Sequence, residues 1–514
     1  MKHLKAKIVK MDKLNLNKVY VLNPFYHLRH DVHRVILFSR GGTDNLCSRN
    51  WCTFIHPLQA ALLSFFTYER PLKETIGLLC NFFCRAEEDI VKWVTEYINN
   101  PYPIHNNSKY GKIYFPKRVL IKVEEAGDKF KYLQLDANLF LWKKLDLTTR
   151  RLYTGPLIVT LMLNNQCVTR CKYCYADTST IVRNPLSTER LLELIRESSN
   201  LNVERVNLMG GEVFLHKEWH ILLKELVLLN IAPEFLSTKM PPDEELISKL
   251  KECGYKGILQ ISLDACDDEV LHKSIGTKYG YVKQMLNGIH LLDKHGIKYQ
   301  IATVLTNYNC NIDILKEMYL KLCTLKEIHD WRIVPVNNSI TKEYKEFSRL
   351  KPTKWQMFDV FNQMQEFIDV HKGFPIILGR DAIFKRYRQT DGGSCNFAGS
   401  ECSALTTHLF VLPDGKVTIC EQLYWNPLFI IGDARLATLK EIWESPKALE
   451  LYTLGQEKIN PHSQCSHCKL FEKCFSYHNR CWSDIIKAYG NDCWDYPDPR
   501  CKFAPEMKNN LGYD

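Results

Sequence analysis

Three cysteines lie within eight residues, in the run C-V-T-R-C-K-Y-C that begins at Cys167 and continues through Cys171 to Cys174. The run directly follows an apolar stretch, Leu157 to Leu163. Thiolates are soft ligands that suit iron–sulfur clusters and zinc. A structural [4Fe–4S] cluster normally takes four cysteines, so three would leave one iron open to a reactant. The spacing therefore predicts a reactive iron–sulfur site, with a zinc knuckle that has its fourth ligand elsewhere as the alternative.

A second field of cysteines occupies the last 120 residues. It contains the pattern C-x12-G-x4-C, then C-x2-C-x5-C, then three more cysteines. Its members are Cys395, Cys402, Cys420, Cys465, Cys468, Cys474, Cys481, Cys493 and Cys501. The run from Leu412 to Val417 carries Pro-Asp-Gly, which predicts a hairpin that holds Cys402 near Cys420. Nine thiols are enough for two complete [4Fe–4S] clusters, and a pair of four-ligand zinc sites is the alternative.

The elements that must position the first three cysteines alternate between strand and helix patterns. The expected strands are 157–163, 203–209, 234–237, 257–263, 298–304 and 331–336. The expected helices between them are 187–199, 217–229, 243–253, 279–295 and 312–325. Repeated β–α units favour a parallel, barrel-like sheet whose active site lies at the carboxyl ends of the strands. The three cysteines follow the first strand, where that rule places a site.

Polar residues end the next three strands. Gly210, Gly211 and Glu212 follow the second strand, Ser237 ends the third, and Ser262 ends the fourth. Two glycines allow a close approach of the backbone to a ligand, and a carboxylate attracts an ammonium group. A Gly-Gly turn with no ligand is the common alternative, but the position directly after a strand favours a binding site.

These patterns together resemble the radical S-adenosylmethionine (radical SAM) superfamily. The resemblance implies an α/β fold with a partial (β/α)6 barrel that binds a [4Fe–4S] cluster and S-adenosyl-L-methionine (SAM). The open iron would bind SAM, and its one-electron cleavage would yield a 5′-deoxyadenosyl radical that takes a hydrogen atom from the substrate. The aromatic residue before the third cysteine, here Tyr173, would pack by the adenine.

The same resemblance gives the strand-end residues their expected roles. The Gly-Gly-Glu motif would contact the amino group of SAM, and Ser262 would help to hold its carboxylate. For Asp264 a helix N-cap or a turn residue is an equal alternative to a functional role. A basic residue often reaches SAM from the next segment in this family. The segment offers only Lys273 and Lys278, so that contact is unassigned.

The C-terminal cysteines resemble the SPASM domain, which usually holds two auxiliary [4Fe–4S] clusters. By that resemblance Cys395, Cys402 and Cys420 share one cluster with a residue after Cys474. The C-x2-C-x5-C cysteines share the other with a late cysteine. For the remaining places Cys481 or His478 is the candidate in the first cluster, and Cys493 or Cys501 in the second.

Glu421 directly follows Cys420. In the sulfatase-maturing relatives an acidic residue at this place takes a proton from the substrate. Glu421 is therefore a candidate general base, and an exposed glutamate at a strand end is the alternative.

The N-terminal 150 residues show a different pattern. Three short helices are expected at 56–66, from 71 onward and at 87–98, and a β pattern follows at 112–123. Over about 50–125 this resembles a winged helix, as in the recognition element of enzymes that modify ribosomally made peptides. Such a domain binds a leader peptide as an added strand. The expected domains are then 1–150 for peptide recognition, 151–375 for the barrel and 376–514 for SPASM.

Composition sets further bounds. The chain has 514 residues, 45% hydrophobic residues and 20 cysteines. No apolar stretch approaches a membrane span or a signal peptide, so the cysteines suggest metal chemistry in a reducing, cytoplasmic compartment. The net charge of +10 is spread along the chain without a cluster, so neither a nucleic acid nor a membrane partner is expected.

We therefore expect a radical SAM/SPASM enzyme that modifies a precursor peptide through a thioether, a carbon–carbon crosslink or side-chain oxidation. Its partners would be the peptide with its leader and a one-electron reductant such as flavodoxin or ferredoxin. An anaerobic formylglycine maturase of the sulfatase type is one alternative. A non-enzymatic metal module that binds DNA is an alternative of another class.

Overall fold

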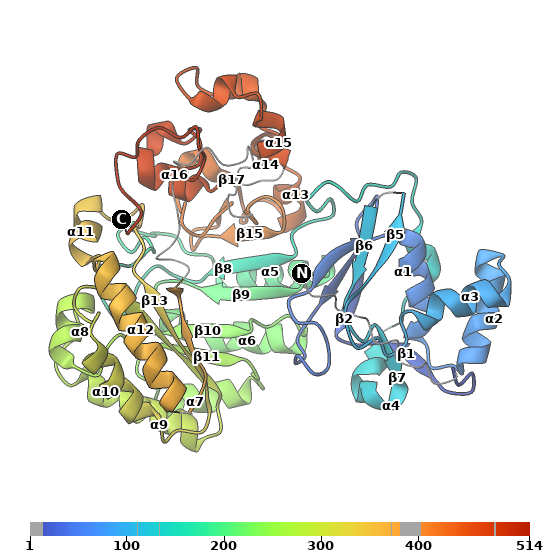
Figure 1. The fold of residues 1–514 in the computed structure, drawn as a ribbon, viewed down its shortest axis with the longest axis horizontal. Coiled ribbons are helices and arrows are strands. Elements are labelled where there is room, and N and C mark those ends of the chain that lie inside the picture. The colour runs from blue at the N-terminus through green and yellow to red at the C-terminus, as the bar shows by residue number, and fades with distance from the viewer. Residues whose placement is uncertain are drawn as a thin grey trace. The chain divides into compact units, whose positions relative to one another are not determined.

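The computed structural model describes residues 14–109, 111–132, 134–371, 373–380, 402–476 and 480–513. Contacts divide the chain into two compact units, residues 1–149 and residues 150–514 (Figure 1). Two candidate ligands, Cys395 and His478, lie outside the described residues. Among the described residues no helix is both long enough and apolar enough to cross a membrane.

Six parallel strands at the centre of the second unit confirm the predicted β–α series. They are β8 (Ile158–Met162), β9 (Arg205–Met209), β10 (Phe235–Thr238), β11 (Ile258–Ser262), β12 (Tyr299–Leu305) and β13 (Ile328–Pro335). Strands β8 and β9 pair in one sheet, and β10 to β13 pair in order in a second sheet that β14 (Ile376–Leu378) extends. Every residue of β8 is buried, as expected for a strand covered on both faces.

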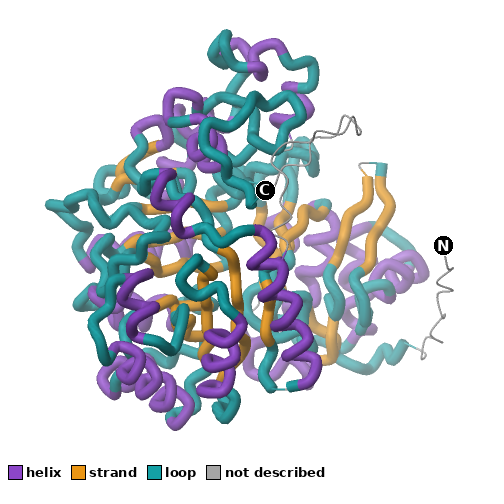
Figure 2. The backbone as a smooth tube through the Cα atoms, turned by 60° about the vertical axis from the view of Figure 1, so that its left-hand side comes forward, coloured by secondary structure: helices purple, strands orange, loops and turns teal. Residues whose placement is uncertain are grey.

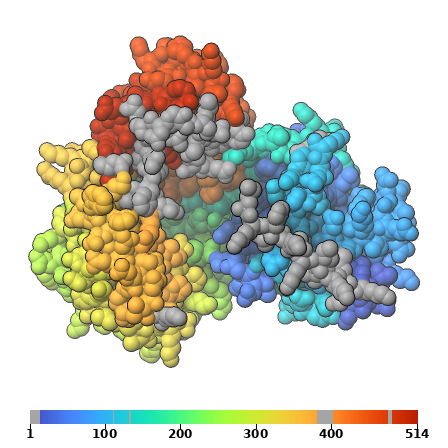
Figure 3. All heavy atoms as spheres, viewed as in Figure 1, coloured from blue at the N-terminus to red at the C-terminus, as the bar shows by residue number. Residues whose placement is uncertain are grey.

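Helices lie outside these strands, as Figure 2 shows. They are α5 (Thr188–Asn200), α6 (Trp219–Leu228), α7 (Glu244–Glu252), α8 (Asp268–Ile275), α9 (Tyr281–Lys294), α10 (Ile312–Leu322), α11 (Tyr344–Leu350) and α12 (Lys354–Val370). Each of α5 to α10 buries one apolar face, for example Leu191, Leu194 and Ile195 of α5. The short helix α8 was not predicted. Helix α12 forms part of the surface seen in Figure 3, where it is orange.

The C-terminal part of this unit begins with β15 (His408–Val411), β16 (Lys416–Thr418) and β17 (Ile430–Asp433). The predicted hairpin is confirmed: β15 and β16 pair antiparallel, and Gly415 in the turn has φ +84°. Strand β15 also pairs in parallel with β8, so the hairpin extends the sheet that carries the first cysteines. The helices α13 (Leu439–Trp443), α14 (Pro446–Tyr452), α15 (Phe471–Ser476) and α16 (Trp482–Tyr489) follow.

The first unit contains three small sheets and four helices within its described residues. Its strands are β1 (Tyr20–Leu22), β2 (Tyr26–His30), β3 (Val35–Ser39), β4 (Cys52–Ile55), β5 (Ile104–Ser108), β6 (Gly111–Phe115) and β7 (Leu120–Lys122). Its helices are α1 (Pro57–Ser64), α2 (Leu72–Phe83), α3 (Glu87–Thr95) and α4 (Val123–Ala126). The three predicted helices are thus confirmed. The winged-helix resemblance and the three domain boundaries stay predictions.

Candidate active site and iron–sulfur centres

The loop that follows β8 gathers the three predicted cysteines. Its backbone is fixed to the end of α8, because Arg170 N donates to Ile275 O (2.8 Å) and Lys172 N donates to Ser274 O (3.1 Å). Within the loop the Thr169 hydroxyl lies 3.6 Å from Cys167 Sγ and 3.3 Å from Cys171 Sγ. The loop therefore stands at the carboxyl end of β8, where a barrel places its reacting groups.

The thiols of this loop are close enough to affect one another. Burial, with contributions from Cys171 and Cys167, raises the pKa of Cys174 to about 11. Burial also raises the pKa of Cys171, while the Lys239 ammonium opposes that rise. These two thiols are protonated near neutral pH unless a metal binds and displaces the proton. Three sulfur donors on one loop fit an iron–sulfur cluster by their chemistry.

The two glycines after β9 allow the strand to pass close to the start of the cysteine loop. A Cβ atom on Gly211 would lie 2.1 Å from the backbone oxygen of Gln166, and one on Gly210 would lie 2.5 Å from that of Asn164. Two backbone hydrogen bonds join the same segments, from Gly211 N to Asn164 O (3.0 Å) and from Glu212 N to Gln166 O (2.8 Å). Any larger side chain would separate β9 from the loop. The close packing of these two segments therefore requires glycine at both positions, whether or not a ligand binds there.

The Glu212 carboxylate is 2% exposed and joins β9 to β10. It accepts hydrogen bonds from Thr238 Oγ1 (3.0 Å), Lys239 N (2.9 Å) and Phe214 N (3.4 Å). Burial raises the pKa of Glu212, and these donors oppose the rise. The contact of this carboxylate with the amino group of SAM stays a prediction.

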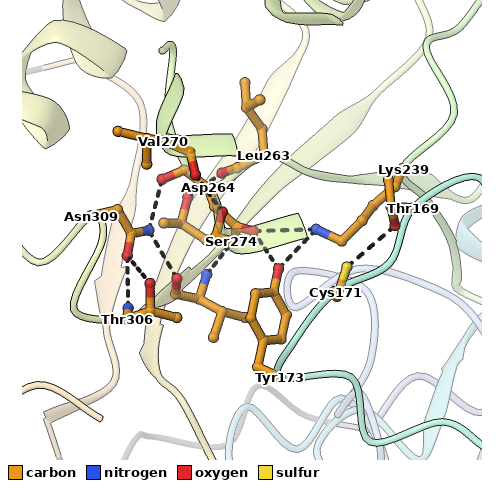
Figure 4. A network of polar contacts seen from close by, with 12 residues as sticks. Thr169, Cys171, Tyr173, Lys239, Leu263, Asp264, Val270, Ser274, Thr306 and Asn309 are labelled. Atoms are coloured by element: carbon orange, nitrogen blue, oxygen red, sulfur yellow. Dashed lines mark hydrogen bonds and ion pairs between the residues drawn. The ribbon is translucent and has the colours of Figure 1, made fainter. Parts of the chain in front are cut away.

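A buried network connects Tyr173 of the cysteine loop with the ends of β10 and β11 (Figure 4). The Tyr173 hydroxyl donates to Asp264 Oδ2. The Lys239 ammonium lies 3.0 Å from the Tyr173 hydroxyl and 3.4 Å from Asp264 Oδ2. Asp264 Oδ1 accepts from Val304 N (2.9 Å) on β12. Because Asp267 caps α8, Asp264 is not its N-cap but a charged group of the site.

Lys239 is the site residue that the sequence did not reveal. Lys273 and Lys278 are the basic residues that the sequence offered, and both are exposed. Lys273 forms an ion pair with Glu269 on its own helix (2.6 Å). Lys239 is instead largely buried and lies beside Cys171, whose pKa it lowers. The only signal in the sequence was a lysine directly after the Ser-Thr end of a buried strand.

The two predicted serines differ in their surroundings. Ser237 Oγ accepts from Gln260 Nε2 (3.0 Å) on the exposed side of β10. Ser262 ends β11 and is half-buried. A small, open pocket lies next to Tyr173, and its wall includes Lys172, Asn337, Asn338 and Lys342. The pocket opens between the cysteine loop and the segment that follows β13.

In the C-terminal part, Cys402, Cys420 and Cys481 form one group. Burial raises the pKa of Cys402 to about 12, with Cys481 adding to the rise. Burial also raises the pKa of Cys420, and both other thiols contribute. The Gln422 amide donates to Cys420 Sγ (3.4 Å), and the Cys481 amide donates to Asp498 Oδ2 (2.9 Å).

A second group contains Cys465, Cys468, Cys474 and Cys501. Burial raises the pKa of Cys474 to about 12, with contributions from Cys465, Cys501 and Cys468, while Arg480 opposes the rise. Burial likewise raises the pKa of Cys501, with contributions from Cys465 and Cys468. The Cys493 thiol instead interacts with the Tyr496 hydroxyl. Cys481 thus interacts with Cys402, and Cys501 with Cys465 and Cys468, although no three possible ligands within the described residues are already arranged around a metal position. Which cysteine completes each cluster stays a prediction.

Glu421 directly follows Cys420 and is half-buried. Burial raises its pKa, and its carboxylate has no hydrogen bond or ion pair within the described part of the chain. Its charge raises the pKa of Tyr175, after burial, and also that of Tyr424. The Tyr424 side chain packs against Cys174 and Ala176. The segment that follows Cys420 therefore reaches the loop of the first three cysteines.

Two family models match parts of this chain. Residues 161–318 match the family model of the radical SAM superfamily, and residues 402–469 match SPASM, an iron–sulfur cluster-binding domain. The chain therefore contains a radical SAM domain and a SPASM domain. Its radical SAM domain binds a [4Fe–4S] cluster and SAM, and its SPASM domain binds auxiliary iron–sulfur clusters.

Curated relatives match only part of this radical SAM protein. The probable GTP 3′,8-cyclase of Archaeoglobus fulgidus is 31% identical over 133 residues, which is 25% of this chain and 42% of the relative. The subtilosin biosynthesis protein AlbA of Bacillus subtilis is 28% identical over 147 residues, which is 29% of this chain and 33% of AlbA. The chain thus spans less than half the length of these two relatives.

The fold is similar over nearly the whole chain to that of Streptococcus suis SuiB. The structure of SuiB bound to SAM aligns with a TM-score of 0.61 over 94% of this chain and 100% of SuiB, at 14% identity. At that identity the likeness establishes the fold alone.

Proposed function

We propose that this chain is a radical SAM enzyme that modifies a ribosomally made precursor peptide. The modification is a thioether, a carbon–carbon crosslink or the oxidation of a side chain. The observation that carries the proposal is the packing of the segment after Cys420 against the loop of Cys174. Glu421, a half-buried acidic residue on that segment, would then stand between a SAM-cleaving site and an auxiliary cluster site.

The residues described above account for the binding of the inorganic groups. Cys167, Cys171 and Cys174 hold the cluster that faces SAM, and Tyr173 and Lys239 belong to the same site. Cys402, Cys420 and Cys481 hold one auxiliary cluster, with Cys395 as its expected fourth ligand. The second auxiliary cluster is held by Cys465, Cys468, Cys474 and Cys501. When bound, these groups supply a 5′-deoxyadenosyl radical and a place for one electron.

Glu421 completes the balance of the reaction. A crosslink or an oxidation to a carbonyl removes two hydrogen atoms from the peptide. One leaves as a hydrogen atom to the deoxyadenosyl group, and the other leaves as a proton and an electron. The proton would go to the Glu421 carboxylate, whose pKa burial raises. An auxiliary cluster held by Cys402, Cys420 and Cys481 would supply a place for the electron.

Relatives support a peptide as the substrate. AlbA is named for subtilosin biosynthesis, and SkfB of Bacillus subtilis is a sporulation killing factor maturation protein. SuiB has been crystallised with its precursor peptide SuiA, and that structure also shares the fold of this chain, with a TM-score of 0.58. Residues 1–149 form a unit of their own, which we assign to binding the leader of the precursor. Flavodoxin or ferredoxin supplies the starting electron.

The test uses the full chain, reconstituted with iron and sulfide without oxygen. It is incubated with SAM, a reductant and the short peptide encoded beside its gene. We expect release of 5′-deoxyadenosine and a peptide that has lost two hydrogen atoms, with the new bond located by tandem mass spectrometry. The variant with Cys167, Cys171 and Cys174 changed to alanine should release none. Deoxyadenosine release by that variant, or zinc in place of iron, contradicts the proposal.

A sulfatase peptide serves as the second substrate in the same experiment. A formylglycine maturase would convert its cysteine or serine to an aldehyde, which carbonyl reagents detect. Modification of that peptide in preference to the leader-bearing precursor would replace the proposal with the sulfatase-type activity.

A further inference from the structure

Arg480 is a buried guanidinium group with unused hydrogen-bond donors. Its side chain is 7% exposed. One nitrogen, Nη2, donates to the backbone oxygen of Tyr496 (2.7 Å). The Nε and Nη1 groups are buried and have no partner among the described residues. A buried charged donor without an acceptor is costly, so a further acceptor is expected beside it.

Hydrogen bonds place Arg480 near the second cysteine group. Tyr496, whose backbone oxygen accepts from Arg480 Nη2, follows Asp495, and the backbone oxygen of Asp495 accepts from Ser463 Oγ (3.1 Å). The same Ser463 Oγ accepts from Cys465 N (3.2 Å). Asp495 Oδ2 accepts from Asn460 N (2.6 Å), its Oδ1 is buried without a partner, and the carboxylate makes no ion pair with Arg480 within the described residues. The unused donors of Arg480 therefore lie near the cysteines that would hold the second cluster.

The position of Arg480 in the chain connects the two auxiliary sites. The next residue, Cys481, belongs to the first cysteine group with Cys402 and Cys420. Two consecutive residues thus provide a cation beside the second cluster (Arg480) and a ligand of the first cluster (Cys481). A change at Arg480 should act on the second cluster and leave the first almost unaltered.

We propose that Arg480 is a positioning residue for the second auxiliary cluster, which donates hydrogen bonds to the cluster sulfur atoms and raises its reduction potential. The inference rests on the proposed assignment of Cys465, Cys468, Cys474 and Cys501 as ligands. A four-thiolate cluster becomes more negative when it gains an electron, so a nearby fixed cation stabilises the reduced form. Arginine suits this place because it stays charged when buried.

The experiment uses the full chain with Cys167, Cys171 and Cys174 changed to alanine, so that only the auxiliary clusters remain. Dithionite titration followed by electron paramagnetic resonance gives the midpoint potential of each cluster. In this background Arg480→Gln should make reduction of one cluster at least tenfold less favourable, equal to 59 mV for a one-electron couple. The other cluster should keep its potential. Arg480→Lys, which keeps the charge, should lie between the two.

Lys502→Gln is the matched control. Lys502 follows the ligand Cys501 and is exposed, so loss of its charge should shift neither potential by a comparable amount. Equal potentials in Arg480→Gln and its parent would overturn the proposal, as would a shift of both clusters together. If the Arg480→Gln variant loses iron, the Arg480→Lys variant provides the test. The proposal requires the Arg480→Lys variant to retain both clusters. Absence of iron from the parent itself would instead refute the ligand assignment.

Discussion

The barrel edge and the C-terminal cysteine region differ in how they partner one buried cation. Lys239 at the barrel edge meets a carboxylate, whereas Arg480 meets none among the described residues, although Arg500 of the same region pairs with Asp498 (2.6 Å). At the barrel edge Lys239 meets Asp264 and Tyr173, and Glu212 receives three donors, all from the protein itself. In the C-terminal region two donors of Arg480 are buried without a partner within the described residues. The barrel site is therefore built by the polypeptide, whereas the C-terminal region has polar groups that a bound cluster would satisfy.

Helix α16 shows how closely the C-terminal region depends on its surroundings. All of its residues are buried, including Asp484 and Lys487. Lys487 Nζ donates to Gln422 Oε1 (2.6 Å), and the backbone N of Gln422 donates to Cys420 Sγ. The helix is thus connected through one residue to the first auxiliary cysteine group. Loss of a cluster there should loosen the helix as well as the ligands.

The largest expected effect comes from removing the iron. Chelation should speed amide hydrogen exchange in α15 and α16 by about tenfold or more, because metal binding and local folding are coupled in this region. Exchange in α5 to α10 should change little. Hydrogen exchange followed by mass spectrometry compares iron-loaded and iron-free protein. Equal increases in the exchange rates of the two sets of helices would show that the C-terminal region does not depend on iron more than the barrel does.

The next effect tests whether the barrel site holds without its cluster. Lys239→Met leaves Asp264 buried and unpaired, which should destabilise the second unit by about 3 kcal/mol or more. Asp264→Asn should also destabilise it, and the double variant should lose less than the sum of the two. Urea unfolding of iron-free protein measures the cycle. Lys273→Met, which removes an exposed ion pair, should change the free energy of unfolding far less. Simple additivity would show that this network does not act as a unit.

The sequence predicted the barrel well for local reasons. The six strands and most helices follow the hydrophobic period, and the cysteine run lies next to the strand that positions it. Lys239 was not predicted, because its role depends on Asp264, a carboxylate at the end of the next strand. The pairing of β15 with β8 was not predicted either, since a hairpin pattern does not indicate which strand the hairpin joins.

The last cluster ligands show the same limit. Cys481, Cys493 and Cys501 are equivalent by residue type, and the family spacing after Cys474 departs from its usual form. Only the folded chain distinguishes them, because it places Cys493 against Tyr496 and the other two beside different cysteine groups. Contacts between residues far apart in the sequence therefore distinguish these three cysteines, which their spacing does not.

Substitution of Glu421, where the barrel and the C-terminal cysteine region meet, should affect stability less but should clearly slow peptide modification. Glu421→Gln keeps the size of the side chain and removes the base, so peptide modification should slow by about 100-fold. Release of 5′-deoxyadenosine should continue, because the barrel site is unaltered. Chromatography of both products measures the ratio. Parallel loss of the two products would place Glu421 in SAM cleavage or in structure instead of in proton removal.

The smallest effect concerns the strand pair that joins the regions. His408 begins β15, opposite Ile158 of β8. Burial, with the charge of Arg205, lowers the pKa of His408 to about 4. Between pH 6.5 and 4 the unfolded chain then binds more protons than the folded one, so stability falls as the pH drops through this window. The loss by pH 5 should be on the order of 2 kcal/mol.

His408→Gln removes this group and should flatten the change in thermal midpoint between pH 7 and pH 5, by a few degrees at most. Differential scanning fluorimetry of both proteins in matched buffers measures it. An equal fall in the two proteins would mean that the acid sensitivity of the second unit comes from other groups. A flatter profile would show that the joint between barrel and C-terminal region opens when His408 takes up a proton. That result would separate the acid response of the joint from the response of the cysteine groups to loss of iron.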